Sequence, residues 1–187
     1  MNRSNRVRII GGKWKRRQLA FPDLPHLRPT PDAVRETLFN WLQFELPGKR
    51  CLDLFAGSGA IGFEAASRGA AQTVLVEGNR RAARSLQENR DLLDANEEIA
   101  VTCADALDFL RCNTQHFDIV FLDPPFQSDL LARSCRLLAK GGHLSPGALI
   151  YIEAPKTQDP LPIAADWPII RTSHRGALKF HLLRYGN

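Results

Sequence analysis

The stretch CLDLFAGSGAIG, residues 51–62, indicates the fold class of this chain. Its first five residues are typical of a buried strand, and Gly57, Gly59 and Gly62 follow in the spacing G-x-G-x-x-G as the strand turns into a helix. Glycine lets the backbone pass close to a ligand because it has no side chain to collide with it. Glu77 ends the next apolar run, where a carboxylate can accept hydrogen bonds from a ribose diol. Proteins that bind NAD and proteins that bind S-adenosylmethionine both use such a glycine loop and acid, so the pattern does not distinguish the two cofactors.

Strands and helices alternate from residue 50 onward. The expected strands are 51–55, 73–77, 99–104, 117–122 and 148–154, and the expected helices between them are 60–69, 79–95, 105–111 and 128–140. Apolar strands separated by amphipathic helices predict a parallel sheet covered on both faces, a doubly wound Rossmann-like α/β domain. Two further runs, 168–173 and 177–184, predict a C-terminal antiparallel hairpin at the sheet edge. An additional helix is expected to begin at Thr30-Pro31, with Thr30 as its N-cap.

Positive charge is concentrated at the N-terminus. Residues 1–35 carry nine Lys or Arg against two acids, or +7, whereas the remaining residues hold 16 basic and 18 acidic groups, or −2. Residues 7–21 read as two short strands around Gly11-Gly12, so we predict a basic β-hairpin arm over residues 1–29 and the main domain over 30–187. The charge favours a nucleic-acid partner, although a solvated, solubilising tail is the alternative. The expected RNA contacts are Arg6, Arg8, Lys13, Trp14, Lys15, Arg16 and Arg17.

Acidic residues stand at four successive strand ends. They are Asp53, Glu77, Asp105 and Asp123. Ligands of a doubly wound sheet lie beyond the carboxyl ends of its strands, so these acids are candidates for the binding site. Asp105 alone is equally well explained as a helix N-cap.

The strand FDIVFL ends in Asp123-Pro124-Pro125-Phe126. Proline cannot donate to a sheet ladder, which explains why the strand stops there. A carboxylate followed by prolines also offers acceptors and few donors, and so suits the two hydrogens of a conjugated amine. Acceptors at that position stabilise the positive charge that develops when the amine attacks, and Phe126 provides a surface on which a planar base can stack. We therefore expect a catalytic amine clamp here.

Other classes of protein find less support. The four cysteines form no C-x-x-C pair, so no metal site is expected. The N-terminus has charge without an apolar segment, and no apolar run approaches the length of a membrane span. We expect a cytoplasmic protein that makes no membrane contact and acts as a monomer.

Taken together, these motifs resemble a known family. FLDPPF resembles the (N/D)-P-P-(F/Y/W) motif of amino-group methyltransferases, and the wider succession resembles the bacterial small-subunit rRNA guanine-N2 methyltransferase (RsmD) family. The matching segments are IIGGKWKRRQL, LRPTPDAVRETLFNWL, LDLFAGSGAIGFEAASRGA, VLVE and FDIVFLDPPF. The resemblance implies a class I methyltransferase domain with a seven-stranded sheet whose last strand pair is antiparallel. It also implies S-adenosylmethionine as cofactor and guanine 966 of 16S rRNA as target, in the small ribosomal subunit or its assembly intermediate.

The resemblance also implies roles for single positions. Asp123, Pro124, Pro125 and Phe126 match the catalytic clamp. The cofactor contacts expected from the family are Arg28, Thr30, Asp53, Phe55, Gly57, Gly59, Glu77, Asp105 and Ala106. Three alternatives stay open on the residues alone: an amino-methyltransferase acting on DNA adenine or cytosine or on a protein glutamine, an NAD-dependent oxidoreductase, and a non-catalytic RNA-binding protein.

Overall fold

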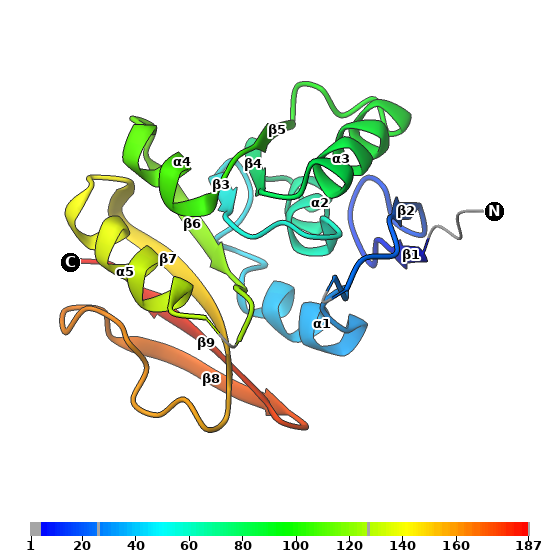
Figure 1. The fold of residues 1–187 in the computed structure, drawn as a ribbon. Helices are drawn as coiled ribbons and strands as arrows, with labels where there is room; N and C mark the ends of the chain where they lie inside the picture. The colour runs from blue at the N-terminus through cyan, green and yellow to red at the C-terminus, as the bar shows by residue number, and fades with distance from the viewer. Residues whose placement is uncertain (1–4, 26, 127, 187) are drawn as a thin grey trace.

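A seven-stranded sheet forms the centre of the molecule in the computed structural model, which describes residues 5–25, 27–126 and 128–186 (Figure 1). The strand order is β5-β4-β3-β6-β7-β9-β8, and β9 runs antiparallel to both of its neighbours. The strands are β3 (Arg50–Asp53), β4 (Gln72–Glu77), β5 (Ile99–Cys103), β6 (Phe117–Leu122), β7 (Leu144–Pro155), β8 (Ile169–Arg175) and β9 (Leu178–Arg184). The predicted Rossmann-like fold, its mostly parallel sheet and its C-terminal hairpin are therefore confirmed.

Helices cover both faces of this sheet, as expected for a doubly wound fold (Figure 1). The helices are α1 (Asp32–Trp41), α2 (Ala60–Ser67), α3 (Arg80–Leu92), α4 (Ala106–Cys112) and α5 (Leu130–Lys140). One buried cluster joins α4 and α5 to one face of the sheet, and another joins α1 and α2 to the other face. The strand order changes direction between β3 and β6, so the crevice outside their carboxyl ends is where such a sheet binds ligands.

Helix α1 begins differently from the expectation. Its N-cap is Pro31, with no side-chain hydrogen bond to the first turn, and Thr30 is buried one residue earlier. The prediction that Thr30 caps this helix is therefore wrong. The main-chain carbonyl of Thr30 instead accepts a hydrogen bond from the buried side chain of Arg35.

The N-terminal hairpin consists of β1 (Asn5–Arg8) and β2 (Gln18–Phe21), which pair antiparallel as predicted. It packs on α2 and α3 through its own buried cluster, to which Val7, Ile9 and Trp14 contribute. Trp14 is only 6% exposed, so its ring packs against the domain in this structure and does not present a face to solvent. The ring anchors the hairpin to α2, because removing an aromatic side chain from water stabilises the folded protein.

A buried charge network ties the same hairpin to the domain. Both carboxylate oxygens of Glu64 accept main-chain hydrogen bonds, from Ile10 at 2.7 Å and from Gly11 at 2.8 Å. Glu64 also pairs with Arg35 at 3.3 Å and with Arg68 at 2.7 Å, and the side chains of Glu64 and Arg35 are both fully buried. Arg35 donates in turn to the carbonyl of Arg8. The hairpin, α1 and α2 are therefore joined at a single carboxylate.

Two further properties of the described ranges bear on function. None of their helices is both long enough and apolar enough to cross a membrane. Within the same ranges, no group of three or more His, Cys, Asp or Glu side chains is arranged to hold a metal ion.

Candidate active site

The glycine turn after β3 has the conformation that the sequence pattern requires. Gly57 and Gly59 have φ values of 52° and 79°, in the left-handed region that favours glycine. Glu77, at the end of β4, holds the turn from the side. Its carboxylate accepts hydrogen bonds from the main-chain N–H of Gly57 at 2.9 Å and from that of Asn79 at 2.7 Å. The acid predicted to bind a ribose therefore also fixes the loop that would lie beneath the cofactor.

The two glycines face different surroundings, which gives a matched pair of variants. A Cβ atom at Gly59 would lie within 2.6 Å of Leu86 and 2.7 Å of Phe63, whereas a Cβ atom at Gly57 would have only the Phe55 carbonyl oxygen nearby, at 3.8 Å. We expect Gly59→Ala to lower the free energy of unfolding by about 2–3 kcal/mol through overpacking. We expect Gly57→Ala to cost about 1 kcal/mol of backbone strain and to weaken cofactor binding at least tenfold.

Urea unfolding and calorimetric titration with S-adenosylhomocysteine measure the two effects separately. If Gly57→Ala binds as tightly as the unmodified protein, then the open side of this turn is not the cofactor cradle. If Gly59→Ala unfolds like the unmodified protein, then the packing argument for Gly59 is wrong.

Asp53 lies directly beneath the turn. It is 3% exposed and accepts a hydrogen bond from the main-chain N–H of Gly62 at 3.0 Å, which joins β3 to α2. Burial, with a smaller contribution from the nearby carboxylates of Asp123 and Glu77, raises the pKa of Asp53 to about 7. A cationic ligand over the turn would stabilise the ionised form of this acid.

The predicted clamp stands beside the turn. β6 pairs in parallel with β3, and the main-chain N–H of Leu54 donates to the Phe121 carbonyl at 3.2 Å, so the loops after both strands emerge next to each other. In the clamp, Pro124 is buried, Pro125 is exposed, and the Phe126 ring is 48% exposed. A ring of this size left half in water is available for stacking. The structure thus brings together the cofactor loop and the clamp that the sequence predicted separately.

Asp123 is in an environment that disfavours its charge. Burial raises its pKa to about 6, while a hydrogen bond from the Thr30 side chain lowers it in part. The family resemblance placed Thr30 at the cofactor. In the structure Thr30 is buried in the segment that connects the hairpin to α1, close enough to the clamp carboxyl to lower its pKa.

The raised pKa of Asp123 has a consequence for stability. The folded protein binds this proton more tightly than the unfolded chain, so the side chain reduces stability progressively as the pH rises from the ordinary pKa of 3.8 to about 6, and the loss is then constant. Asparagine does not titrate. We therefore expect the stability of Asp123→Asn relative to the unmodified protein to be greater at about pH 8 than at about pH 4. The increase in this difference of unfolding free energy should be at most about 3 kcal/mol. Urea unfolding at both pH values measures this gain, and an equal difference at the two would contradict it.

The remaining predicted cofactor residues lie around the same edge of the sheet. Asp105 is exposed after β5 and caps α4, accepting from the main-chain N–H groups of Leu107 and Asp108. Ala106 is buried behind it, Phe55 is half-buried next to the glycine turn, and Arg28 is exposed in the segment before α1. All of these positions are compatible with their predicted roles as cofactor contacts.

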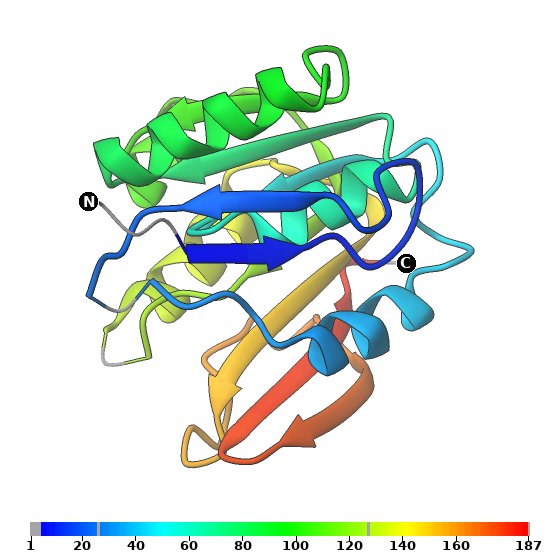
Figure 2. The same cartoon turned by 90° about the vertical axis from the view of Figure 1, so that its right-hand side faces the viewer.

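The basic loop between β1 and β2 lies elsewhere. The main-chain N–H of Lys13 bonds to the carbonyl of Ser67 at the end of α2, and its side chain pairs with Glu98 just before β5. Since α2 runs back along the sheet, this places residues 13–17 at the edge where the parallel strands begin, opposite the clamp (Figure 2). Arg8 pairs with Asp32, and Arg6 bonds to Gln18. The sequence did not predict this separation, because it depends on how the hairpin docks.

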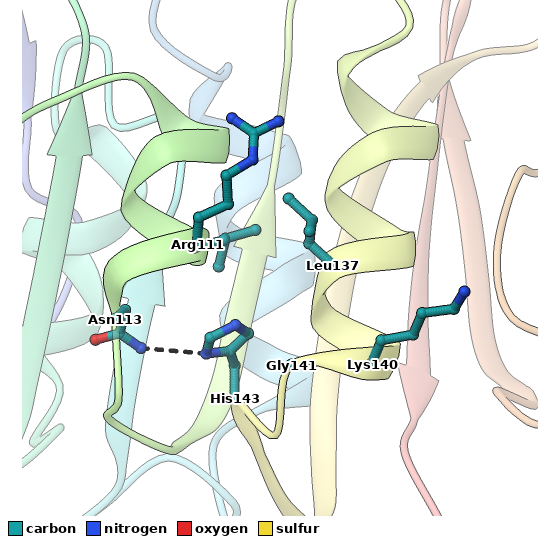
Figure 3. Close-up of a pocket in the computed structure, with 7 residues that line it drawn as sticks. Arg111, Asn113, Leu137, Lys140, Gly141 and His143 are labelled. Atoms are coloured by element: carbon teal, nitrogen blue, oxygen red, sulfur yellow. Dashed lines mark hydrogen bonds between the residues drawn. The ribbon is translucent and has the colours of Figure 1, made fainter.

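A cavity away from the clamp lies between the ends of α4 and α5. It has a volume of about 260 Å³ and is at the edge where the parallel strands begin (Figure 3). His143 faces it, and its Nδ1 atom lies 3.3 Å from the side-chain amide nitrogen of Asn113. Nothing in this cavity resembles the acceptor chemistry of the clamp.

Two residues near the clamp were missed by sequence reasoning. Glu153 and Tyr151 lie at the end of β7, beside β6, and the Tyr151 hydroxyl donates to the Glu153 carboxyl at 2.9 Å. Both are buried. The available signal was an acid ending the apolar run IYIEA, as at the other strand ends.

Comparisons with known proteins agree with this geometry. The family model described as "Conserved hypothetical protein 95" matches residues 7–184. The chain is 43% identical over 180 residues to Ribosomal RNA small subunit methyltransferase D of Escherichia coli, covering 96% of this chain and 90% of that protein. It is 41% identical over 184 residues to the protein of the same name from Haemophilus influenzae, covering 97% and 95%.

Solved structures give the same result. The candidate methyltransferase yhhF of Escherichia coli superposes with a TM-score of 0.91 at 38% identity, covering 98% of this chain and 99% of that one. The Thermus thermophilus 16S rRNA N2 methyltransferase RsmC, solved with AdoMet and guanosine, shares the fold with a TM-score of 0.74 at 22% identity, covering 98% of this chain and 50% of that one.

The glycine turn at the switch point of this seven-stranded sheet, with the clamp on the adjoining strand, defines a Rossmann-like methyltransferase. Within that class, the chain belongs to the conserved hypothetical protein 95 family, the family of ribosomal RNA small subunit methyltransferase D. The resemblance drawn from the sequence motifs is thereby confirmed.

Proposed function

We propose that this protein transfers a methyl group from S-adenosylmethionine to the exocyclic N2 of guanine 966 in 16S rRNA. The observation that carries the proposal is the adjacency of the glycine turn after β3 and the clamp after β6. The relatives named as small-subunit methyltransferases support the substrate class, and their similarity extends over nearly the whole chain. We further propose that the substrate is the small subunit or its assembly intermediate.

The residues present fit the proposed cofactor. The open side of Gly57 leaves room for a ligand, and Glu77 beside it has the acceptor oxygens that a ribose diol needs. The buried carboxyl of Asp53 and the half-buried carboxyl of Asp123 form no ion pair with a described Lys or Arg side chain. A cation between them would offset the free-energy cost of holding these carboxylates, in their ionised form, away from water. S-adenosylmethionine is cationic at its sulfur and, when bound, supplies an electrophilic methyl group.

The chain's own residues act on the base. Phe126 offers a surface on which an unstacked guanine can lie, as in other enzymes that act on single bases. The ionised Asp123 accepts one N2 hydrogen, and a main-chain carbonyl of the two prolines accepts the other. These acceptors stabilise the positive charge that grows on N2 as it attacks, and the proton can leave afterwards. A strong base is therefore not needed.

We also propose that the basic loop contacts rRNA away from the target base. A strand of six residues spans about 20 Å, so the loop and the clamp would contact different parts of a folded RNA. The Lys15→Ala/Arg16→Ala variant is expected to reduce the salt dependence of RNA binding by about two units of slope, since each removed phosphate contact lowers it by about one. Filter binding at several salt concentrations measures the slope. The control is Arg111→Ala/Lys140→Ala at the α4–α5 cavity, which should leave the slope unchanged, and an unchanged slope for the loop variant would contradict its RNA contact.

Mass mapping of 16S rRNA from cells that lack this chain tests the function. The N2-methyl group at the target guanine should be missing, and purified protein with tritiated cofactor should restore it on small subunits isolated from those cells. Intact methylation in such cells would refute the proposal. Transfer to naked duplex DNA in preference to subunits would favour the DNA alternative, and tight binding of NADH without S-adenosylhomocysteine would favour the oxidoreductase.

A further inference from the structure

The C-terminal part of the chain carries a second concentration of positive charge. Residues 155–187 hold five Lys or Arg against two acids, whereas residues 36–154 hold 11 against 16. The five basic residues are Lys156, Arg171, Arg175, Lys179 and Arg184. Because the middle of the chain is acidic, the near-zero total after residue 35 conceals this basic segment.

Strand β8 carries part of this charge along one edge of the sheet. Among the described strands, β8 pairs only with β9. Since β9 is antiparallel to both of its neighbours, β8 runs in the direction of β6 and β7 and ends at the edge where the clamp lies. The main-chain N–H of Lys156, just after β7, donates to the Ala177 carbonyl at 2.9 Å and so fixes the β8–β9 turn against the end of β7. Figure 2 shows this turn on the side of the molecule away from the basic loop.

The strand register places two arginines close to the level of the clamp acid. Followed across β7 and β9, the pairing sets Asp123 level with Ser173 of β8. Arg171 and Arg175 lie two positions before and two positions after Ser173. Three strand spacings separate β6 from β8, or about 14 Å.

Both arginines lie on the same face of the sheet as the clamp acid. Arg171 pairs with Leu182 and Arg175 pairs with Leu178, and both leucines pack in the buried cluster under α1. Residues paired across neighbouring strands share a face. Asp123 shares this face too, because the residue two positions earlier in β6 belongs to the same cluster.

The cations nearest to the clamp edge are not neutralised by described carboxylates. Lys156, Arg171 and Arg175 are exposed, and none of them takes part in the ion pairs that the described residues form. Lys179 differs, since it pairs with Asp159 at 3.6 Å. Charged side chains on an edge strand also prevent pairing with other chains, but acids would serve that purpose equally well. The sequence of β8 contains cations and no acid, which favours an anionic ligand.

We propose that β8 and its turn bind phosphates of the rRNA strand that carries the target base, through Arg171, Arg175 and Lys156. A base held at the clamp stays covalently joined to its neighbours, so phosphates a few nucleotides away must pass close to this edge. Phosphate contacts fix the position of a nucleic acid without reading its sequence. The β8 contacts therefore hold the target nucleotide at the clamp, whereas the basic loop binds a more distant part of the RNA. The inference rests on the proposed function, in which the clamp receives that base.

The salt dependence of binding tests the phosphate contacts. For Arg171→Gln/Arg175→Gln, filter binding to small subunits and to protein-free 16S rRNA should give a slope reduced by about two units on both. Arg111→Gln/Lys140→Gln, which removes two cations at the opposite edge of the sheet, is the control and should leave both slopes unchanged. Unchanged slopes for the β8 variant would overturn the proposal. A reduction on subunits alone would mean that β8 contacts a ribosomal protein, and would also overturn it.

The sign of the charge separates RNA binding from protection of the edge. Arg171→Glu/Arg175→Glu and Arg171→Lys/Arg175→Lys both keep a charged edge, so neither variant should self-associate. At one fixed salt concentration, the Glu variant should bind small subunits at least about tenfold more weakly, and the Lys variant within about threefold of the unmodified protein. Both should bind S-adenosylhomocysteine normally. Normal subunit binding by the Glu variant would show that these positions serve only to protect the edge.

Ethylation of single phosphates shows where on the RNA the contact lies. In the unmodified protein, ethylation a few nucleotides from the target guanine should weaken binding, and in Arg171→Gln/Arg175→Gln this interference should disappear. Interference that persists in the variant would overturn the placement. All of these readouts measure binding and do not require methyl transfer. Failure of the unmodified protein to methylate any subunit contradicts the proposed function instead.

Discussion

Asp123→Asn is expected to lower kcat for methyl transfer about 10³-fold while S-adenosylhomocysteine binds within about twofold of the unmodified affinity. The amide has one acceptor oxygen in place of a charged carboxylate, and its NH2 group would face the hydrogens of the substrate amine. The variant therefore loses the stabilisation of positive charge that develops only during transfer, which lowers kcat and leaves cofactor binding intact.

Transfer of tritium from the labelled cofactor to unmodified small subunits gives kcat, and calorimetry gives the affinity. Asp108→Asn is the matched control, since it makes the same chemical change at an exposed position on α4. In the unmodified protein, kcat/KM should rise with pH through about 6, where Asp123 ionises. Near-normal turnover of Asp123→Asn would show that the clamp does not act through this carboxylate.

Glu64→Ala is expected to lower the free energy of unfolding by about 3–5 kcal/mol, the usual cost of removing one partner from a buried ion pair. It leaves the fully buried Arg35 without its nearest buried counter-charge and removes the acceptor for two main-chain N–H groups, those of Ile10 and Gly11. For a domain of this size, the corresponding fall in Tm is roughly 6–20 °C.

Urea unfolding measures the loss, and hydrogen exchange at Ile10 and Gly11 should accelerate more than exchange in the central strands, because the hairpin loses its attachment first. Glu88→Ala is the control: its pair with Arg84 is exposed on α3 and should change stability by no more than about 0.5 kcal/mol. A loss below about 1 kcal/mol for Glu64→Ala would mean that apolar packing, and not this network, holds the hairpin.

Much of the fold and part of the site could be predicted because they depend on local features of the chain. Strand and helix periods gave the alternation, glycine spacing gave the turn at Gly57 and Gly59, and Pro124-Pro125 marked the end of β6. Once strands are parallel, their carboxyl ends meet at one edge, so the positions of Asp53, Glu77 and Asp123 followed from the fold class.

The positions that sequence reasoning missed or misplaced depend on contacts between distant segments. Trp14 is aromatic and stands among basic residues, which suggests RNA contact, but the docking of the hairpin on α2 buries it. The same docking carries residues 13–17 to the edge opposite the clamp. Thr30 has the residue type of a helix cap, yet the N-cap of α1 is Pro31 and the Arg35 side chain donates to the Thr30 carbonyl.

The sequence by itself therefore determined the sheet, the glycine turn and the clamp, because each is encoded by neighbouring residues whose period and turn chemistry are read directly. Only the tertiary structure decided that Glu153 and Thr30 lie against Asp123, and that the basic loop lies away from it. Those relations arise when β7, the segment before α1 and the hairpin pack against one another, and the residue types of the separate segments do not specify such long-range packing.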